Sequence, residues 1–303
     1  MRNCLGLLFC MVCGAILVCT SRAQESGAEE NPACFDTVVV TVPSRPSFSN
    51  GTATTQCGVA EVEYGWNHQW PGGRARQDSL GGGLRFGITP KLDFHWSSDS
   101  FLNVFDGEKA ERGFGDTWLG LKYRFYEGSR RVPALAILYL AKIPSASENK
   151  GLGTGQADHA VSLLASKDIA FVHFDLNLIE FIGGRNTRPG VDHCSQFALS
   201  ASSPVKGRLG AILEGYGATE LSSDSPSFAS SMLGLTYQVN RRMVFDGGID
   251  VGLMHGAPRQ RVFVGITYAI KNMYAWLTPA TRISQKNETK RANFHQAPYD
   301  YGD

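Results

Sequence analysis

The sequence has no excess of charge of either sign and, after its first segment, no long hydrophobic run. Its 29 Lys and Arg residues nearly balance 28 Asp and Glu residues. Proteins that bind nucleic acid usually carry a basic surface, so we expect no nucleic-acid partner. After residue 23, no apolar run reaches the length of about 18 residues that a membrane-spanning helix requires, which excludes a helical membrane protein.

Motifs for metal or nucleotide binding are also missing. The seven His residues are scattered and show no metal-ligand spacing. The segment Gly151–Gln156, with the sequence GLGTGQ, lacks the Lys and Ser or Thr that follow a phosphate-binding loop. We therefore expect neither a metal nor another cofactor.

The first 23 residues have the pattern of a secretory signal peptide. Arg2 precedes an apolar run, and the small residues Ser21 and Ala23 precede the expected cleavage point. Because removal of this segment takes four cysteines with it, three remain, at positions 34, 57 and 194. An oxidising compartment allows a disulfide between Cys34 and Cys57, and free thiols are the alternative.

The exported chain divides into three parts. Residues 24–54 form a polar N-terminal extension that contains one short apolar stretch, Thr37–Val42, which could be a strand. Residues 55–270 repeat segments of alternating apolar and polar residues, separated by turn residues. Residues 271–303 form a polar C-terminal tail, unless Met273–Leu277 adds a short strand.

Strict alternation in the middle part predicts strands with one apolar and one polar face. In the segment 115–126, Leu119, Leu121 and Tyr123 share a face, whereas Lys122 and Arg124 lie on the other. About twelve such segments occur, each near the length of about 10 residues that a tilted membrane-spanning strand requires. We predict an all-β fold, an antiparallel transmembrane β-barrel of about 12 strands; a soluble β-sandwich is the alternative.

In a barrel of this kind the polar face would point into the lumen. We expect these charges either to select the cargo or to pair across the lumen and plug it. The candidate lumen-facing residues are Glu61, Glu63, Arg85, Asp93, His95, Asp116, Lys122, Arg124, Lys142, Asp175, Glu214, Asp246 and Asp250.

Three segments resemble a known family. GFGDTWLGLKYRF at 113–125 is similar to the Gly-x-Gly-Asp…Gly-x-Lys-Tyr-Arg signature of the phenol-degradation MetA-pathway family of outer-membrane barrels. The segment 143–168 is similar to the family's Pro-Thr…Gly-x-Gly…Asp motif, with Ser145 in place of Thr, and 236–253 with 264–270 resembles its last hairpin. The resemblance implies a transporter-like channel, with the family name suggesting an aromatic cargo.

The sequence therefore predicts a non-enzymatic channel or transporter for small molecules in the bacterial outer membrane. Its partners would be membrane lipid and an unidentified cargo, in an oligomeric state that the sequence does not define. An exported enzyme or soluble binding module remains the alternative. For a hydrolase, the pairs His159 with Ser162 and His173 with Asp175 would be the candidates.

Overall fold

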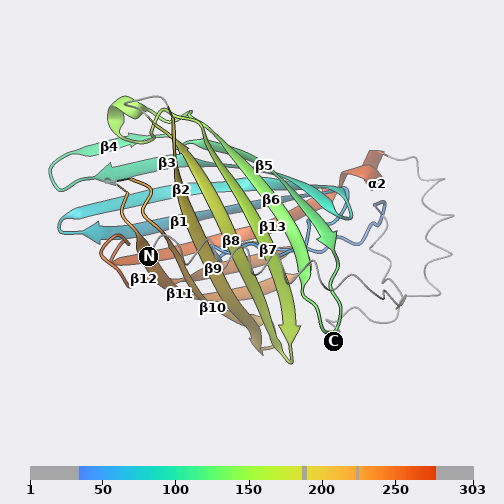
Figure 1. Ribbon diagram of the computed structural model, residues 1–303. Coiled ribbons are helices and arrows are strands. Elements are labelled where there is room, and N and C mark those ends of the chain that lie inside the picture. The colour runs from blue at the N-terminus through green and yellow to red at the C-terminus, as the bar shows by residue number, and fades with distance from the viewer. Residues whose placement is uncertain (1–33, 186–189, 223–224, 278–303) are drawn as a thin grey trace, which may run out of the picture. The chain divides into compact units, whose positions relative to one another are not determined.

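The computed structural model describes residues 34–185, 190–222 and 225–277. Twelve antiparallel strands of these residues close into a barrel, because each pairs with two neighbours and the last, β13, pairs back with β1 (Figure 1). The strands of the barrel are β1 (Val59–Gly72), β2 (Ala75–Thr89), β3 (Leu92–Phe105), β5 (Thr117–Tyr126), β6 (Ala134–Ile143), β7 (Asp158–Ile169), β8 (Val172–Gly184), β9 (Val191–Lys206), β10 (Leu209–Ala218), β11 (Phe228–Asn240), β12 (Met243–Gly252) and β13 (Gln260–Asn272). The short β4 (Ala110–Gly113) pairs with the far end of β3, beyond β5. The predicted fold class is thus confirmed.

The two faces of the wall differ in chemistry as the alternation predicts. Leu121 is 47% exposed on the outer face of β5, whereas its neighbour Lys122 is 1% exposed and points inward. Leu213 and Glu214 on β10 show the same contrast, with exposures of 59% and 1%. The barrel therefore has an apolar outer wall and a polar inner wall, the arrangement of a barrel that lies in lipid.

The connections differ in length between the two ends of the barrel. Strand pairs β2–β3, β7–β8, β9–β10 and β11–β12 are joined by two-residue turns at the end where β1 begins and β13 ends. We call this end the turn end. The other end, the loop end, carries the two-residue β1–β2 turn and most of the longer connections, among them residues 144–157 with the 3-10 helix η1 (Glu148–Lys150).

One loop-end connection is ordered by a side chain. The carboxylate of Asp106, between β3 and β4, accepts hydrogen bonds from the backbone N–H groups of Glu108 and Lys109, at 2.8 Å each. These bonds lower the pKa of Asp106 below its ordinary value because they stabilise its charged form, and the bond from Lys109 has the larger effect.

The chain after β13 forms a single helical turn. Helix α2 (Met273–Leu277) takes the place of the short strand that the sequence allows here, while the rest of the predicted tail lies outside the described residues, as does the predicted signal peptide. Asn272 accepts a hydrogen bond from the backbone N–H of Ala275 at 3.0 Å and so turns the chain away from β13. In the described part of the chain, no helix has the length and apolar character needed to cross a membrane.

Candidate functional site

Residues 34–57, which we call the inner segment, run through the lumen of the barrel. They correspond largely to the described part of the predicted N-terminal extension, and they form no strand at Thr37–Val42. The segment starts at the turn end, where the backbone N–H of Thr41 donates to the carbonyl of Arg241 in the β11–β12 turn at 2.8 Å. It also finishes there, where Cys57 forms an isolated bridge with Gly87 of β2.

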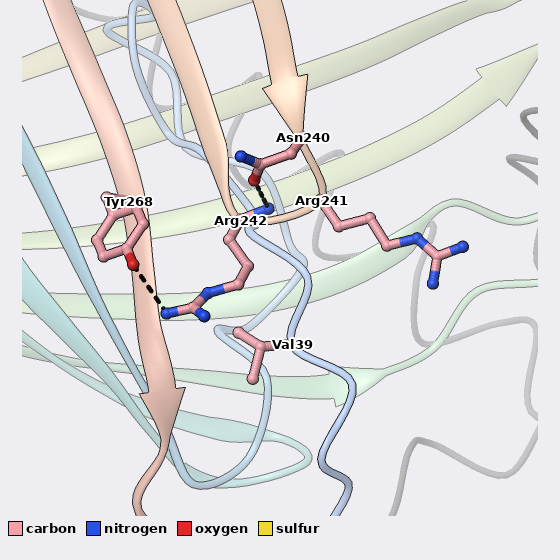
Figure 2. A pocket seen from close by; sticks show the side chains of 5 residues that line it. All are labelled: Val39, Asn240, Arg241, Arg242 and Tyr268. Atoms are coloured by element: carbon pink, nitrogen blue, oxygen red, sulfur yellow. Dashed lines mark hydrogen bonds between the residues drawn. The ribbon is translucent and has the colours of Figure 1, made fainter.

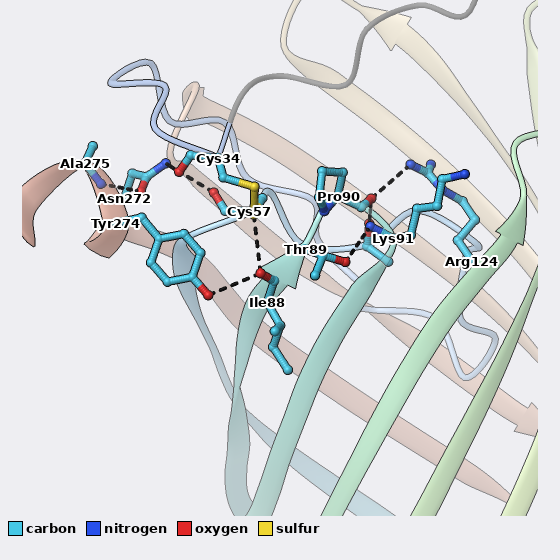
Figure 3. Close-up of a disulfide and its surroundings, with 11 residues drawn as sticks. Cys34, Cys57, Ile88, Thr89, Pro90, Lys91, Arg124, Asn272, Tyr274 and Ala275 are labelled. Carbon is cyan, nitrogen blue, oxygen red and sulfur yellow. Dashed lines mark hydrogen bonds between the residues drawn. A yellow bond between two sulfur atoms is a disulfide. The ribbon is translucent and has the colours of Figure 1, made fainter. Parts of the chain in front are cut away.

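A disulfide between Cys34 and Cys57 joins the two ends of the inner segment (Figure 3). The side-chain amide of Asn272, the last residue of β13, donates to the carbonyls of both cysteines, at 3.0 and 3.1 Å. The Sγ atom of Cys57 also lies 3.5 Å from the carbonyl oxygen of Ile88. The inner segment is therefore a covalently closed loop that is fixed to the wall at the turn end.

The first wall contacts of the inner segment are with β1. Glu61, fully buried, accepts hydrogen bonds from the Thr41 hydroxyl at 2.6 Å and from the backbone N–H of Val42 at 2.8 Å. Two residues along, Glu63 accepts from the backbone N–H of Ser44 at 2.6 Å. Arg85 of β2 pairs with both carboxylates, so their negative charges are compensated inside the barrel.

The next contact, made by Arg45, is with β12. Its guanidinium donates to both carboxylate oxygens of Asp246, at 3.0 and 3.1 Å. It lies against Gly65 of β1 and Gly265 of β13, where an added Cβ would come within 2.6 and 2.3 Å of guanidinium atoms. Because only glycine leaves this space, the wall is shaped to accept Arg45.

The next contact is with β10. Glu214, which is 1% exposed, accepts hydrogen bonds from the backbone N–H groups of Phe48 at 2.8 Å and Ser49 at 2.6 Å. The ring of Phe48 stacks on the ring of Tyr216, two residues further along the same strand, with centroids 4.7 Å apart. One strand thus supplies both a charged and an apolar contact.

The segment then contacts β8 and β7. The amide side chain of Asn177 accepts from the backbone N–H of Asn50 at 2.7 Å and donates to its carbonyl at 2.8 Å. The hydroxyl of Ser166 accepts from the backbone N–H of Thr52 at 2.8 Å, and it donates to Asp175 at 2.5 Å. Neutral side chains here satisfy backbone groups that have no strand partner.

The last contacts are with β5 and β3. The ammonium group of Lys122 donates to the carbonyl of Ala53 at 2.6 Å and to that of Gly51 at 3.3 Å. Asp93 accepts from the backbone N–H of Thr55 at 2.7 Å and lies 3.8 Å from Lys122. In sequence order the segment has contacted β1, β12, β10, β8, β7, β5 and β3, so it makes one circuit of the inner wall.

The inner segment is not buried along its whole length. Most of its residues are buried or half-buried, yet Pro43 and Ala53 remain exposed to water. Arg45 also keeps 24% of its side-chain surface accessible. The inner segment therefore keeps part of its own surface accessible to solvent.

Of the thirteen predicted lumen residues, seven form hydrogen bonds with the inner segment. His95 binds Asp93 at 2.9 Å, and Asp175 is linked to the segment through Ser166. Arg124 lies near the turn end, 3.1 Å from Glu127.

The last three predicted residues lie in the loop-end half of the barrel, where wall residues pair with each other. Lys142 lies 3.4 Å from Asp116 and also pairs with Asp158. Asp250 pairs with Arg261 at 2.9 Å and accepts a hydrogen bond from Tyr216.

Several residues that contact the predicted lumen residues or the inner segment are not predicted from the sequence. Arg45, Asn177, Ser166 and Arg261 were not among the candidates, because a strand pattern ranks charges by face and says nothing of what they contact. The two cysteines that flank the N-terminal extension were the available signal that this extension is a closed loop.

The structure does not assemble the two hydrolase candidates as nucleophile and base. His159 contacts the Tyr139 hydroxyl on the outer wall at 2.7 Å, whereas Ser162 is buried on the inner face. The imidazole of His173 lies between two carboxylates, 2.6 Å from Asp168 and 3.2 Å from Asp175. Within the described ranges, no group of three or more His, Cys, Asp or Glu side chains is placed to hold a metal ion.

A shallow cavity of about 400 Å³ opens at the turn end, beside the start of the inner segment (Figure 2). It is lined by Val39, Asn240, Arg241, Arg242 and Tyr268. The guanidinium of Arg242 donates to the Tyr268 hydroxyl at 2.9 Å, and Figure 2 shows the Arg241 side chain extending away from that pair.

Solved structures with a similar fold are outer-membrane proteins. An outer membrane channel from Pseudomonas putida F1 is similar over 76% of this chain and 100% of its own, with 14% identity and a TM-score of 0.53. The KdgM porin, solved with oligogalacturonate, is similar over 69% of this chain and 99% of its own, with 10% identity and a TM-score of 0.47. No curated protein matches this sequence.

The family resemblance seen in the sequence is confirmed by a family model. The model described as "Putative MetA-pathway of phenol degradation" matches residues 95–270, which run from β3 to β13 and make up more than half of the chain. The inner segment, β1 and β2 lie outside the matched region. The protein belongs to this family, and it has the fold of an outer-membrane channel.

Proposed function

We propose that this protein is an outer-membrane channel or transporter for small molecules, whose passage is narrowed by the inner segment. The observation that carries the proposal is a closed barrel with an apolar outer wall and a polar inner wall, in which the chain's own segment is held by side-chain hydrogen bonds. Export by the predicted signal peptide, with the turn end in the periplasm, is part of this proposal. Short periplasmic turns and longer outer loops are the usual arrangement.

The proposal extends to the class of cargo. Beside the inner segment the lumen contains an apolar cluster of Tyr216, Met232, Phe263 and Ala198, against which Phe48 and Phe228 pack. These side chains are buried against the inner segment, so they would line the passage only where the segment is displaced. The family description, which refers to phenol degradation, favours small apolar or aromatic molecules as the cargo.

The test is conductance and solute uptake by the full chain in planar bilayers and vesicles. Glu214→Gln weakens the two hydrogen bonds to the inner segment, because the amide nitrogen of Gln cannot accept them. We expect this variant to conduct at least severalfold more than the parent. Glu180→Gln is the matched control, since Glu180 contacts His193 and Ser195 instead.

Two outcomes would reject the proposal. One is recovery of the exported protein as a soluble monomer without detergent. The other is a parent and a Glu214→Gln variant that insert into the membrane and yet pass neither ions nor small apolar solutes.

A further inference from the structure

Basic residues lie in three of the four two-residue turns at the turn end, and the fourth, the β7–β8 turn, has Lys167 and Asp168 beside it. Lys91 lies in the β2–β3 turn, and Lys167 is two residues before the end of β7. Lys206 and Arg208 flank the β9–β10 turn, and the β11–β12 turn consists of residues 241 and 242, both arginines. The longer β5–β6 connection at this end adds a further pair, residues 130 and 131, also both arginines.

Few of these charges are compensated. Lys91 pairs with Glu127 at 3.8 Å. Lys167 donates to the backbone carbonyls of Ser129 and Arg130, at 2.6 and 2.8 Å. In the described part of the chain, the exposed side chains of Arg130, Arg131, Lys206 and Arg241 take part in no ion pair, and Figure 2 shows Arg241 extended at its turn. The turn end therefore keeps a ring of free positive charge.

The loop end has no such bias. Lys109 pairs there with Glu111, and Arg185 pairs with Asp192. The described loops mix Arg74, Lys150 and Arg259 with Asp106, Glu148 and Glu220. Charge is thus distributed unevenly between the two ends of a chain that is close to neutral as a whole.

Apolar side chains place the basic ring at the level of lipid headgroups. Phe171, in the β7–β8 turn, is 77% exposed, and Ile169 beside it is 60% exposed. Val205, which precedes Lys206 at the end of β9, is 59% exposed. Tyr237 on β11, 49% exposed, lies four residues before Arg241. Aromatic and apolar residues of this kind mark a membrane interface, and the cations just beyond them meet the phosphates.

We propose that the turn end binds the headgroups of anionic phospholipids in the membrane leaflet that surrounds it. This inference rests on the proposed function, because it requires the barrel to span a membrane. Anionic phosphate complements the uncompensated cations, while the adjoining exposed Phe171, Ile169 and Val205 would contact acyl chains, which a protein partner or free phosphate does not offer. The ring thereby also fixes the depth of the barrel in the bilayer.

The test compares retention of two lipids by the full chain. Protein in mild detergent is mixed with equal amounts of phosphatidylglycerol and phosphatidylcholine, and bound lipid is counted by native mass spectrometry. We expect the parent to retain the anionic lipid by about fivefold or more over the zwitterionic one, the factor expected for even a single cation at an anionic surface. The combined variant Arg130→Gln, Arg131→Gln, Lys206→Gln and Arg241→Gln should reduce this ratio severalfold.

The matched control removes four cations at the loop end, with Arg74→Gln, Lys109→Gln, Lys150→Gln and Arg259→Gln, and should leave the ratio unchanged. Equal retention of both lipids by the parent, or an equal loss in both variants, overturns the inference. Heat-modifiable gel mobility in phosphatidylcholine vesicles separates this failure from failure of the proposed function. A barrel that inserts there but shows no lipid preference contradicts only the basic ring.

Discussion

The two halves of the lumen hold their charges in different ways. In the turn-end half, Glu61, Glu63 and Glu214 accept hydrogen bonds from the backbone of the inner segment. In the loop-end half, Lys142 and Asp250 pair instead with other residues of the wall. The same residue types thus bind the inner segment in one half and pair with each other in the other half. Only the contacts with the inner segment can break while the barrel stays closed.

The largest effect is expected from Arg85→Met. This substitution leaves Glu61 and Glu63 without their cation in a buried site, which should destabilise the protein by about 3–5 kcal/mol. Arg261→Met in the loop-end half, where the arginine is 28% exposed, should cost clearly less. Urea titration followed by heat-modifiable gel mobility measures both. Equal losses would erase the distinction between the two halves.

The next effect concerns the two faces of β5. Leu121→Arg places a charge on the lipid side and should cost about 2–4 kcal/mol. Alternation alone ranks Lys122→Leu as mild, because it adds an apolar residue to a barrel. The structure reverses this ranking, since Lys122 binds two carbonyls of the inner segment and lies beside Asp93.

We therefore expect Lys122→Leu to be at least as destabilising as Leu121→Arg in the same titration. Full stability of Lys122→Leu would show that the contacts of Lys122 with the inner segment contribute little.

A smaller effect, confined to the turn-end half, should follow removal of the disulfide. The double variant Cys34→Ser with Cys57→Ser frees the two ends of the inner segment and should weaken its retention by about 2–4 kcal/mol, with the barrel intact. Limited proteolysis of the folded protein would report cleavage within residues 34–57. Cys194→Ser, a buried free thiol on β9, is the control that should leave protection unchanged.

The smallest effect is on ion selectivity. Acids outnumber bases among the candidate lumen residues, which favours cations in the passage, but Arg45 and Arg261 compensate two of these acids. Asp246→Asn leaves Arg45 unmatched and should shift the reversal potential in a salt gradient toward anions. Asp250→Asn should do so less, since Tyr216 remains beside Arg261. Identical potentials for the parent and both variants would remove any role of these charges in selection.

The alternation of apolar and polar residues predicted the strands of the barrel wall, but it did not predict the contacts of the inner segment. The period of two placed Leu121 outward and Lys122 inward correctly, because a strand alternates its faces whatever it pairs with. The inner segment has no such period: Thr41, Arg45 and Asn50 find partners on different strands, and those contacts depend on closure of the whole barrel. The residues that respond to the segment, such as Gly65 and Asn177, look like ordinary strand positions until the segment is in place.

The contacts of the inner segment with many strands constrain the order in which the barrel assembles. Its bonds to Asp246, Glu214 and Asn177 join residues separated by 201, 166 and 127 positions, whereas its disulfide spans 23. Contacts between such distant residues form slowly, since the intervening chain must first be organised. The segment is synthesised before every strand that surrounds it, yet it can settle only when the last hairpin has arrived. Assembly of this barrel therefore requires the wall to close around a loop that is already part of the same molecule.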